Sequence, residues 1–267
     1  MRTFLILLFT WAATVASAQE TMRMAVTTSF HNSGLADVLL PEIEADLDLE
    51  VQLLIVGTGQ ALRLGEAGDV DAILVHSRAA EEAFVAAGFA THRREIMYND
   101  FVLVGPKNDP AQIALATSAT ESLQNIADAA VGFVSRGDDS GTHKKEQSLW
   151  EGAGIDPETS GTWVRAVGAG MGAALNTASA MNAYILSDRA SWLNFANKGN
   201  LELLYAGDPA LFNQYAYLPV NPARHDHVNA DAAARLEAWL TSDRAATLIN
   251  GYTIDGEPLF VFNAEAD

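Results

Sequence analysis

The chain has 267 residues, of which 49% are apolar and 19% charged, so it can bury a substantial core and is not a disordered chain. Its 34 acidic and 16 basic residues give a formal net charge of −18, which argues against nucleic acid or an anionic membrane surface as a partner. The sequence contains no cysteine, which excludes disulfides, thiolate metal sites and a cysteine nucleophile.

The first 18 residues, MRTFLILLFTWAATVASA, have the organisation of a cleavable secretion signal. Arg2 supplies the positive charge, an apolar segment follows over 3–15, and an A-x-A cleavage site ends at Ala18. The apolar segment is short for a membrane-spanning helix. We expect cleavage after Ala18 and, because no cysteine is available for a lipid anchor, a soluble acidic protein in the periplasm of a Gram-negative bacterium.

Strand and helix signals then alternate along the chain. Strands are predicted over 22–29, 51–56, 71–76, 96–98 with 101–105, 131–135, 183–186, 201–205 and 215–220. Helices are predicted over 34–47, 60–68, 81–87, 142–152, 174–182 and 230–250. This order predicts an α/β fold of two lobes, each with a parallel sheet and helices on both faces, around a ligand cleft.

The lobes are expected to be discontinuous in sequence. Lobe 1 is predicted to hold residues 19–100 and 218–267, and lobe 2 residues 101–217. The chain is expected to cross between them at 99–104 and again at 215–221.

At four places a predicted strand ends in serine, threonine or glycine and a helix begins at once. The first turn of a helix has N–H groups without partners and a partial positive charge, so it can bind an anion. In open α/β sheets the ligand lies beyond the carboxyl ends of the strands. These residue types are also ordinary N-caps, but four such places in one chain favour a shared site. They lie at 27–34, 56–59, 135–142 and 168–172.

The third of these places, VSRGDDSGTHKKE (134–146), also contains Arg136. Its guanidinium can donate two hydrogen bonds to an oxyanion. The alternative is a surface arginine paired with Asp138 or Asp139.

Three other clusters are weaker candidates. Ser140 and His143 could serve a serine hydrolase, but the sequence has no G-x-S-x-G motif. His225 and His227 are spaced like a metal-binding pair, but they lie in a predicted surface loop. The acidic run over 42–50 lacks the glycine spacing of a calcium loop. We therefore expect no catalytic residue, no protein-bound metal and no cofactor.

Three segments are specific in combination: GTGQAL (57–62), GDVDAILVH (68–76) and SRGDDSGTH (135–143). Together with TTSFHNSGLADVLLP, MYNDFVLVGP, GAGMGAAL, DPALFNQYAYLPVNP and DGEPLF they are spread over nearly the whole mature chain, which resembles the periplasmic tungstate-binding proteins of ABC importers. The resemblance implies a type II periplasmic-binding-protein fold and a non-enzymatic protein. It also implies tungstate as the ligand, molybdate as a second candidate, and permease subunits in the inner membrane as partners of a monomer.

The resemblance also implies which residues contact the oxyanion. Here Ala25 and Val26 stand where the family usually has a further threonine, and no acidic residue precedes Ser33, so the roles of His31 and Asn32 stay open. The implied contacts are Thr28, Ser29, Thr58, Arg136, Ser140, Gly141 and Thr142.

The pattern Arg-x-Asp-x-Ser-Gly-Thr also resembles the anion loop of periplasmic phosphate-binding proteins, so phosphate is an alternative ligand. In those proteins a carboxylate at the position of Asp138 accepts the proton of hydrogen phosphate. Tungstate carries no proton at neutral pH, so its site should offer donors only. We expect Asp138 to turn away from the cleft and to hold Arg136. A sensory receptor in place of a permease is an alternative partner.

Overall fold

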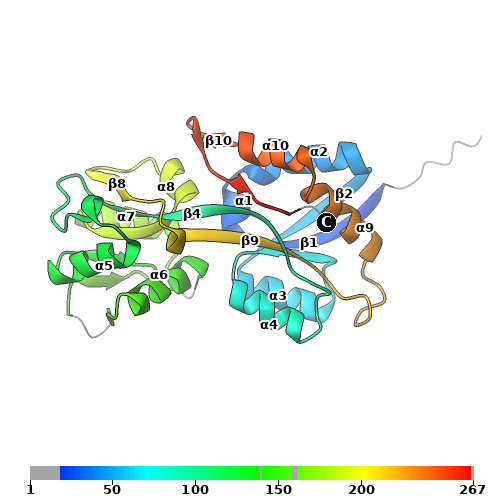
Figure 1. Cartoon of the computed structure of the whole chain (residues 1–267), viewed down its shortest axis with the longest axis horizontal. Helices are drawn as coiled ribbons and strands as arrows, with labels where there is room; N and C mark the ends of the chain where they lie inside the picture. The colour runs from blue at the N-terminus through cyan, green and yellow to red at the C-terminus, as the bar shows by residue number, and fades with distance from the viewer. Residues whose placement is uncertain (1–18, 139, 158–160, 266–267) are drawn as a thin grey trace, which may run out of the picture.

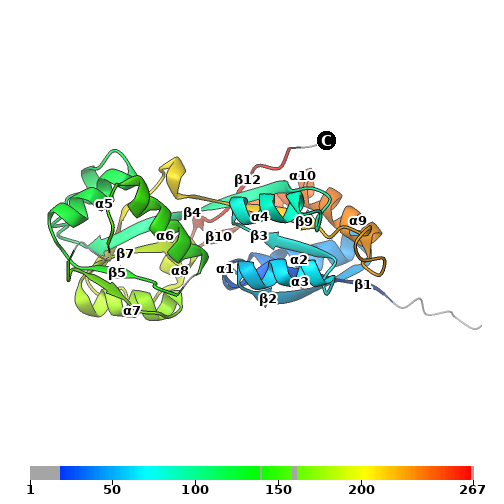
Figure 2. The same cartoon turned by 90° about the horizontal axis from the view of Figure 1, so that it is seen from below.

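Two long strands, β4 (Arg94–Pro106) and β9 (Phe212–Pro219), run between two α/β lobes in the computed structural model (Figures 1 and 2). The structure describes residues 19–138, 140–157 and 161–265. The expected signal segment and its cleavage site lie outside the described residues.

Lobe 1 is built on β1 (Glu20–Thr27), which pairs in parallel with β2 (Leu49–Val56) and β3 (Ala72–Val75). All four residues of β3 are buried, as expected for a parallel strand covered on both faces. The helices of this lobe are α1 (Thr28–Asn32), α2 (Leu35–Leu47), α3 (Thr58–Ala67), α4 (Arg78–Ala86), α9 (Ala230–Leu240) and α10 (Asp243–Gly251).

Lobe 2 is built on β5 (Phe133–Ser135), which pairs in parallel with β6 (Val164–Ala166) and β7 (Tyr184–Asp188), while β8 (Leu201–Tyr205) pairs antiparallel with β4. Its helices are α5 (Ala119–Asp128), α6 (Gly141–Gly152), α7 (Met171–Met181) and α8 (Arg189–Asn194), with 3-10 turns at Ile113–Leu115 and Pro209–Leu211. Short strands β10 (Thr253–Ile254), β11 (Glu257–Pro258) and β12 (Val261–Phe262) end the chain.

Strand β4 changes partner where it passes from one lobe to the other. It pairs with β9 as far as Asp100 and with β7 from Phe101 onward. Strand β9 already pairs with β4 at Phe212, so residues 212–217, which the sequence places in lobe 2, lie in the sheet of lobe 1. The strand that returns the chain therefore begins at Phe212, before the expected crossing segment 215–221, and it lies between β3 and β4 in the sheet.

Other local expectations are also corrected. The sheets are mixed, since β4 and β9 run antiparallel to their neighbours. The helix expected over 230–250 is two helices, because the Ser242 hydroxyl accepts the N–H of Ala245 and begins α10. Residues 28 and 29 begin α1 and do not extend β1. The predicted two-lobed α/β class is confirmed.

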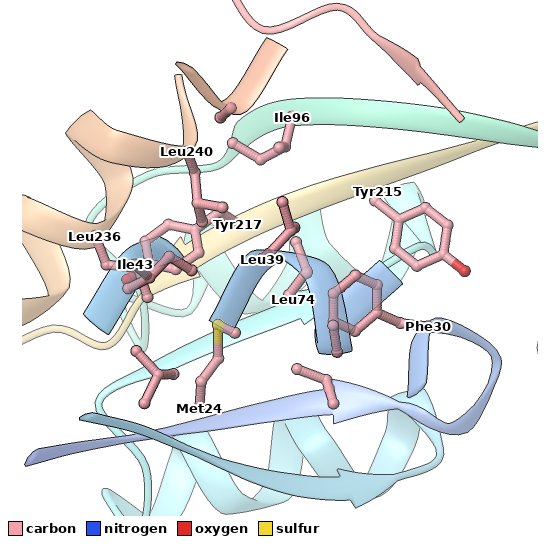
Figure 3. Close-up of a cluster of buried hydrophobic side chains, with 14 of the residues drawn as sticks. Met24, Phe30, Leu39, Ile43, Leu74, Ile96, Tyr215, Tyr217, Leu236 and Leu240 are labelled. Atoms are coloured by element: carbon pink, nitrogen blue, oxygen red, sulfur yellow. The ribbon is translucent and has the colours of Figure 1, made fainter. Parts of the chain in front are cut away.

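Buried apolar side chains of α1, α2, α9, β1, β3, β4 and β9 pack together in the core of lobe 1 (Figure 3). Lobe 2 has its own clusters on the two faces of its sheet. Within the described ranges, no helix is both long and apolar enough to cross a membrane.

We predict that Leu39→Ala lowers the free energy of unfolding by about 2–5 kcal/mol, because it empties space in this core. Leu39 is 3% exposed, whereas Leu115, the matched control, is 79% exposed. Leu115→Ala should change the free energy by less than about 0.5 kcal/mol. Chemical denaturation followed by circular dichroism measures both, and equal effects would contradict the assigned core.

Candidate functional site

The carboxyl ends of the parallel strands in lobe 1 lie at one edge of its sheet. Thr27 at the end of β1 pairs with Val56 at the end of β2, and Val26 pairs with Leu74 of β3. The segments that follow these strands therefore start side by side. They begin with Thr28, Gly57 and His76.

Lobe 2 repeats this arrangement with the segments before α6 and α7. Ser135 at the end of β5 pairs with Ala166 at the end of β6. Immediately beyond, the N–H of Gly168 donates to the carbonyl of Arg136 at 2.8 Å. The Arg136 segment and the Gly168–Gly172 segment are thus adjacent.

Arg136 is buried, and its side chain is fixed by contacts on several sides. Its Nε donates to the carbonyl of Ala169 at 2.9 Å, its Nη2 donates to the Asp138 carboxylate, and its Nη1 lies 3.5 Å from Sδ of Met171. Within the described part of the chain these contacts use three of the five N–H donors of the guanidinium.

The chain turns back at Gly137 so that Asp138 reaches Arg136. Gly137 has φ = +59°, a left-handed conformation that favours glycine. Asp138 Oδ1 also accepts the N–H of Ser140 at 3.3 Å. Although burial opposes it, hydrogen bonds from Ser140 and the charge of Arg136 lower the pKa of Asp138. The expected pairing of Asp138 with Arg136 is therefore present.

A hydrogen-bonded cluster around Ser29 stands at the edge of lobe 1. Ser29 Oγ lies 3.0 Å from Oγ1 of Thr27, 3.1 Å from Nε2 of His76 and 3.2 Å from the hydroxyl of Tyr215. One hydroxyl offers one donor and two acceptor positions, so these three contacts occupy all of them.

Burial sets the protonation of this cluster. It lowers the pKa of His76 to about 4, which hydrogen bonds to the backbone and to Asn213 oppose and the charge of Lys145 reinforces. Burial also raises the pKa of Tyr215 to about 12. At neutral pH the imidazole is therefore uncharged and the phenol keeps its proton.

The two edges meet at His76. A Cβ added to Gly141, the first residue of α6, would lie 2.8 Å from Cε1 of His76. His76 belongs to lobe 1 and Gly141 to lobe 2, so the lobes contact each other at the candidate site.

The four predicted helix starts divide into two kinds. Thr27 and Ser140 are ordinary N-caps whose hydroxyls accept the N–H of Phe30 and His143. Helices α3 and α7 start after Gly57 and Gly170, which provide no side-chain cap. Their first-turn N–H groups consequently lack a side-chain acceptor from the cap residue.

Contacts in the structure link only some of the seven predicted contact residues to one another. Ser29 and Gly141 are linked through His76, and Ser140 reaches Arg136 through Asp138. The others lie in first turns: Thr28 is exposed in α1, Thr58 is half-buried in α3 and Thr142 is buried in α6, while His31 and Asn32 are exposed at the end of α1.

Sequence reasoning missed several polar groups near these residues. His76 and Asp188 could have been found, because His76 directly follows β3 and Asp188 ends β7 and caps α8. The others, Glu146, Asn213 and Tyr215, lie within α6 and β9, where no local pattern marks a site.

The residues of the weaker clusters have other contacts. The Ser140 hydroxyl accepts the N–H of His143 as the cap of α6. Nε2 of His225 lies 3.0 Å from the carbonyl of Glu66, and Nε2 of His227 lies 2.9 Å from that of Gly68. Among the described residues no group of three or more histidine, aspartate or glutamate side chains could hold a metal ion.

A cavity of about 900 Å³ lies beside α6 within lobe 2. Its lining includes Glu146, Trp150 and Val164, but none of the seven predicted contact residues. It is also lined by Ser135 and Gly137, which flank Arg136, so it lies next to the Arg136 segment.

Two α/β lobes joined by crossing strands approach each other where His76 meets the start of α6, and a buried, fixed arginine lies beside that start in lobe 2. This is the architecture of a two-lobed binding protein whose helix starts suit a small anion. The model of the PBP superfamily domain matches residues 12–244. The tungstate-binding protein TupA of Peptoclostridium acidaminophilum is 45% identical over 92% of this chain and 87% of its own length, and TupA of Campylobacter jejuni is 37% identical over 89% of each.

Solved structures agree with these matches. The tungstate-binding protein TupA from Desulfovibrio alaskensis G20 has a TM-score of 0.87 at 42% identity and covers 92% of this chain and 100% of its own. A tungstate ABC transporter structure from Geobacter sulfurreducens has a TM-score of 0.79 at 46% identity and covers 88% and 100%. The chain therefore belongs to the PBP superfamily and, within it, to the TupA family. The predicted type II periplasmic-binding-protein fold is confirmed.

The pH dependence of stability tests the buried position of Glu146 next to Arg136. It is 3% exposed, and its Oε2 accepts the N–H of Arg136 at 3.3 Å. Burial raises the pKa of Glu146 from 4.5 to about 7, although hydrogen bonds from Ser135 and from the backbone N–H of Arg136 oppose the shift. Between these pH values the folded state holds a proton that the unfolded state has lost, so stability falls as the pH rises.

We predict that Glu146→Gln removes this pH-dependent contribution to stability. Between pH 4.5 and 7.5 the free energy of unfolding of the wild type should therefore fall by roughly 2–3 kcal/mol relative to that of the variant. Glu151→Gln, an exposed change on the same helix, should leave the pH profile unchanged. Chemical denaturation across this pH range provides the comparison. Parallel profiles for the wild type and Glu146→Gln would show that Glu146 is ionised in the folded protein.

Proposed function

We propose that this protein captures tungstate in the periplasm and delivers it to the permease of an ABC importer without changing it chemically. The observation that carries the proposal is Arg136, which is buried in lobe 2 and fixed beside the starts of α6 and α7. The family relatives, which are named as tungstate-binding proteins, support the choice of ligand. Molybdate, which has the same shape and charge, is the second ligand.

The proposal assigns the anion to donors from both lobes. Lobe 2 contributes the N–H groups of Arg136 that its protein partners do not use, together with the first turns of α6 and α7. Lobe 1 contributes the first turn of α3 at Thr58 and the hydroxyls of Thr28 and Ser29. Because the Ser29 hydroxyl has three partners already, binding requires it to exchange one of them for the anion.

The energetics favour tight binding despite the acidic chain. Hydrogen bonds that involve a charged group contribute about 1.5–3 kcal/mol each, so five or six of them offset the cost of ordering the anion and closing the lobes. The net charge of −18 opposes any anion at long range. The contacts must therefore be short, direct and shielded from water.

Partner and location follow from the same proposal. We assign the first 18 residues to a signal peptide that is cleaved after export, and the mature protein to a monomer that docks on membrane permease subunits. The bound anion is cargo, so the proposal needs no cofactor and no catalytic residue.

Arg136→Ala should weaken tungstate binding at least tenfold, because it removes the one cationic side chain that we assign to the anion. Arg165→Ala, an exposed change on β6 of the same lobe, is the matched control and should bind like the wild type. Isothermal titration calorimetry measures both. An unchanged affinity in Arg136→Ala would remove Arg136 from the site.

Calorimetry of the wild type with tungstate, molybdate, sulfate and phosphate tests the choice of ligand. Asp138 is committed to Arg136 and to Ser140, so we expect no acceptor for the proton of hydrogen phosphate and a preference for the unprotonated tungstate. Asp138→Asn should therefore not abolish a preference for tungstate over phosphate. Tighter binding of phosphate than of tungstate in the wild type would contradict the proposal.

A further inference from the structure

His76 lies between the lobes, but it is neither one of the hydrogen-bond donors that we assign to the anion nor a helix cap. It follows β3 of lobe 1, yet its Cε1 lies where the first residue of α6 in lobe 2 would carry its side chain. A Cβ on Gly141 would come within 2.8 Å of Cε1, closer than a Cβ atom approaches another heavy atom in real structures. This approach of the lobes therefore requires glycine at position 141.

The imidazole is held firmly in this place. Its Nε2 lies 3.1 Å from Oγ of Ser29, and its ring packs against that of Tyr215 with centroids 4.8 Å apart. Tyr215 is itself fully buried on the crossing strand β9. A side chain added at Gly141 could displace the ring only by breaking these contacts, so the lobes would have to move apart.

The contact also bears on the hydroxyl of Ser29. If Nε2 of His76 donates to Ser29 Oγ, the hydroxyl keeps its own proton to donate elsewhere; if Ser29 donates to Nε2, that proton is consumed. An oxyanion needs the first arrangement, which places the single N–H of the neutral imidazole at Nε2. His76 and Tyr215 then donate to Ser29, and the Ser29 hydroxyl donates its own hydrogen bond to the anion.

We propose that His76 is a positioning residue that couples closure of the lobes to formation of the anion site, through a closing contact made by His76 and Gly141. When the lobes meet, the imidazole, which is already hydrogen-bonded to the hydroxyl of Ser29 within lobe 1, covers the start of α6. The inference rests on the proposed capture of tungstate, because it names how that same site closes.

A double-mutant cycle tests the closing contact. Gly141→Ala keeps the backbone N–H that we assign to the anion and adds only the Cβ that meets His76. His76→Ala removes the ring that the Cβ meets. Gly251→Ala is the matched control, because this glycine ends α10 and a Cβ there has nothing within 4 Å. Thermal denaturation verifies that each variant is folded.

Two quantities are measured for each variant: tungstate affinity by calorimetry, and the separation of the lobes by energy transfer between two dyes. The chain has no cysteine of its own, so Gln52→Cys in lobe 1 and Leu115→Cys in lobe 2, both exposed, place the dyes uniquely. Every variant is studied in this labelled background, with and without tungstate.

We expect Gly141→Ala to weaken tungstate binding at least tenfold and to shift the lobes toward separation. In the His76→Ala background the same change should cost less than about twofold, because the obstructing ring is gone. His76→Gln, which keeps an N–H donor for Ser29, should bind more tightly than His76→Ala. Gly251→Ala should match the wild type.

An equal cost of Gly141→Ala in both backgrounds, or wild-type behaviour of Gly141→Ala, would overturn the inference. Failure of the proposed function gives a different result, namely a folded wild type that does not bind tungstate. In that case the distance between the lobes, measured without ligand, still tests the closing contact. The contact predicts that the lobes lie farther apart in Gly141→Ala than in the wild type, and that the double variant restores the wild-type distance. Equal distances in all variants would refute the contact.

Discussion

The arrangement around Arg136 is the constraint on which the candidate site depends. A guanidinium is costly to bury unless its donors are satisfied, and here a carbonyl, a carboxylate and a thioether hold it at the starts of two helices. Asp138 fixes the orientation of the guanidinium, and the turn at Gly137 makes that pairing possible. In a chain with a net charge of −18, such local geometry has to supply the attraction for an anion that the overall field repels.

The crossing strands join this arginine to the other half of the site. Strand β9 connects β3 to β4 and also carries Tyr215, which contacts both Ser29 and His76. Its neighbour Asn213 bonds to Asn99 on the other crossing strand at 2.8 Å. The strand that returns the chain to lobe 1 therefore also supplies a hydrogen-bond partner of Ser29 and a packing partner of His76.

The sequence predicts well what depends on local pattern. Strand ends followed at once by helix starts are local features, and they place Thr58, Arg136 and Gly141 at two sheet edges. It does not reveal contacts between distant segments: Ser29 meets His76 47 positions away and Tyr215 186 positions away. The apolar pattern over 230–250 likewise hid the break at Ser242, whose N-cap overrides a continuous helical period.

A crystal structure of the tungstate complex, with tungsten located by its anomalous scattering, tests the central claim most directly. The account predicts one strong peak between the lobes, within hydrogen-bonding distance, through its oxygens, of Arg136 and of the first turn of α6, with Asp138 still paired to Arg136. A peak in the cavity beside Trp150, or on the surface away from Arg136, would contradict it.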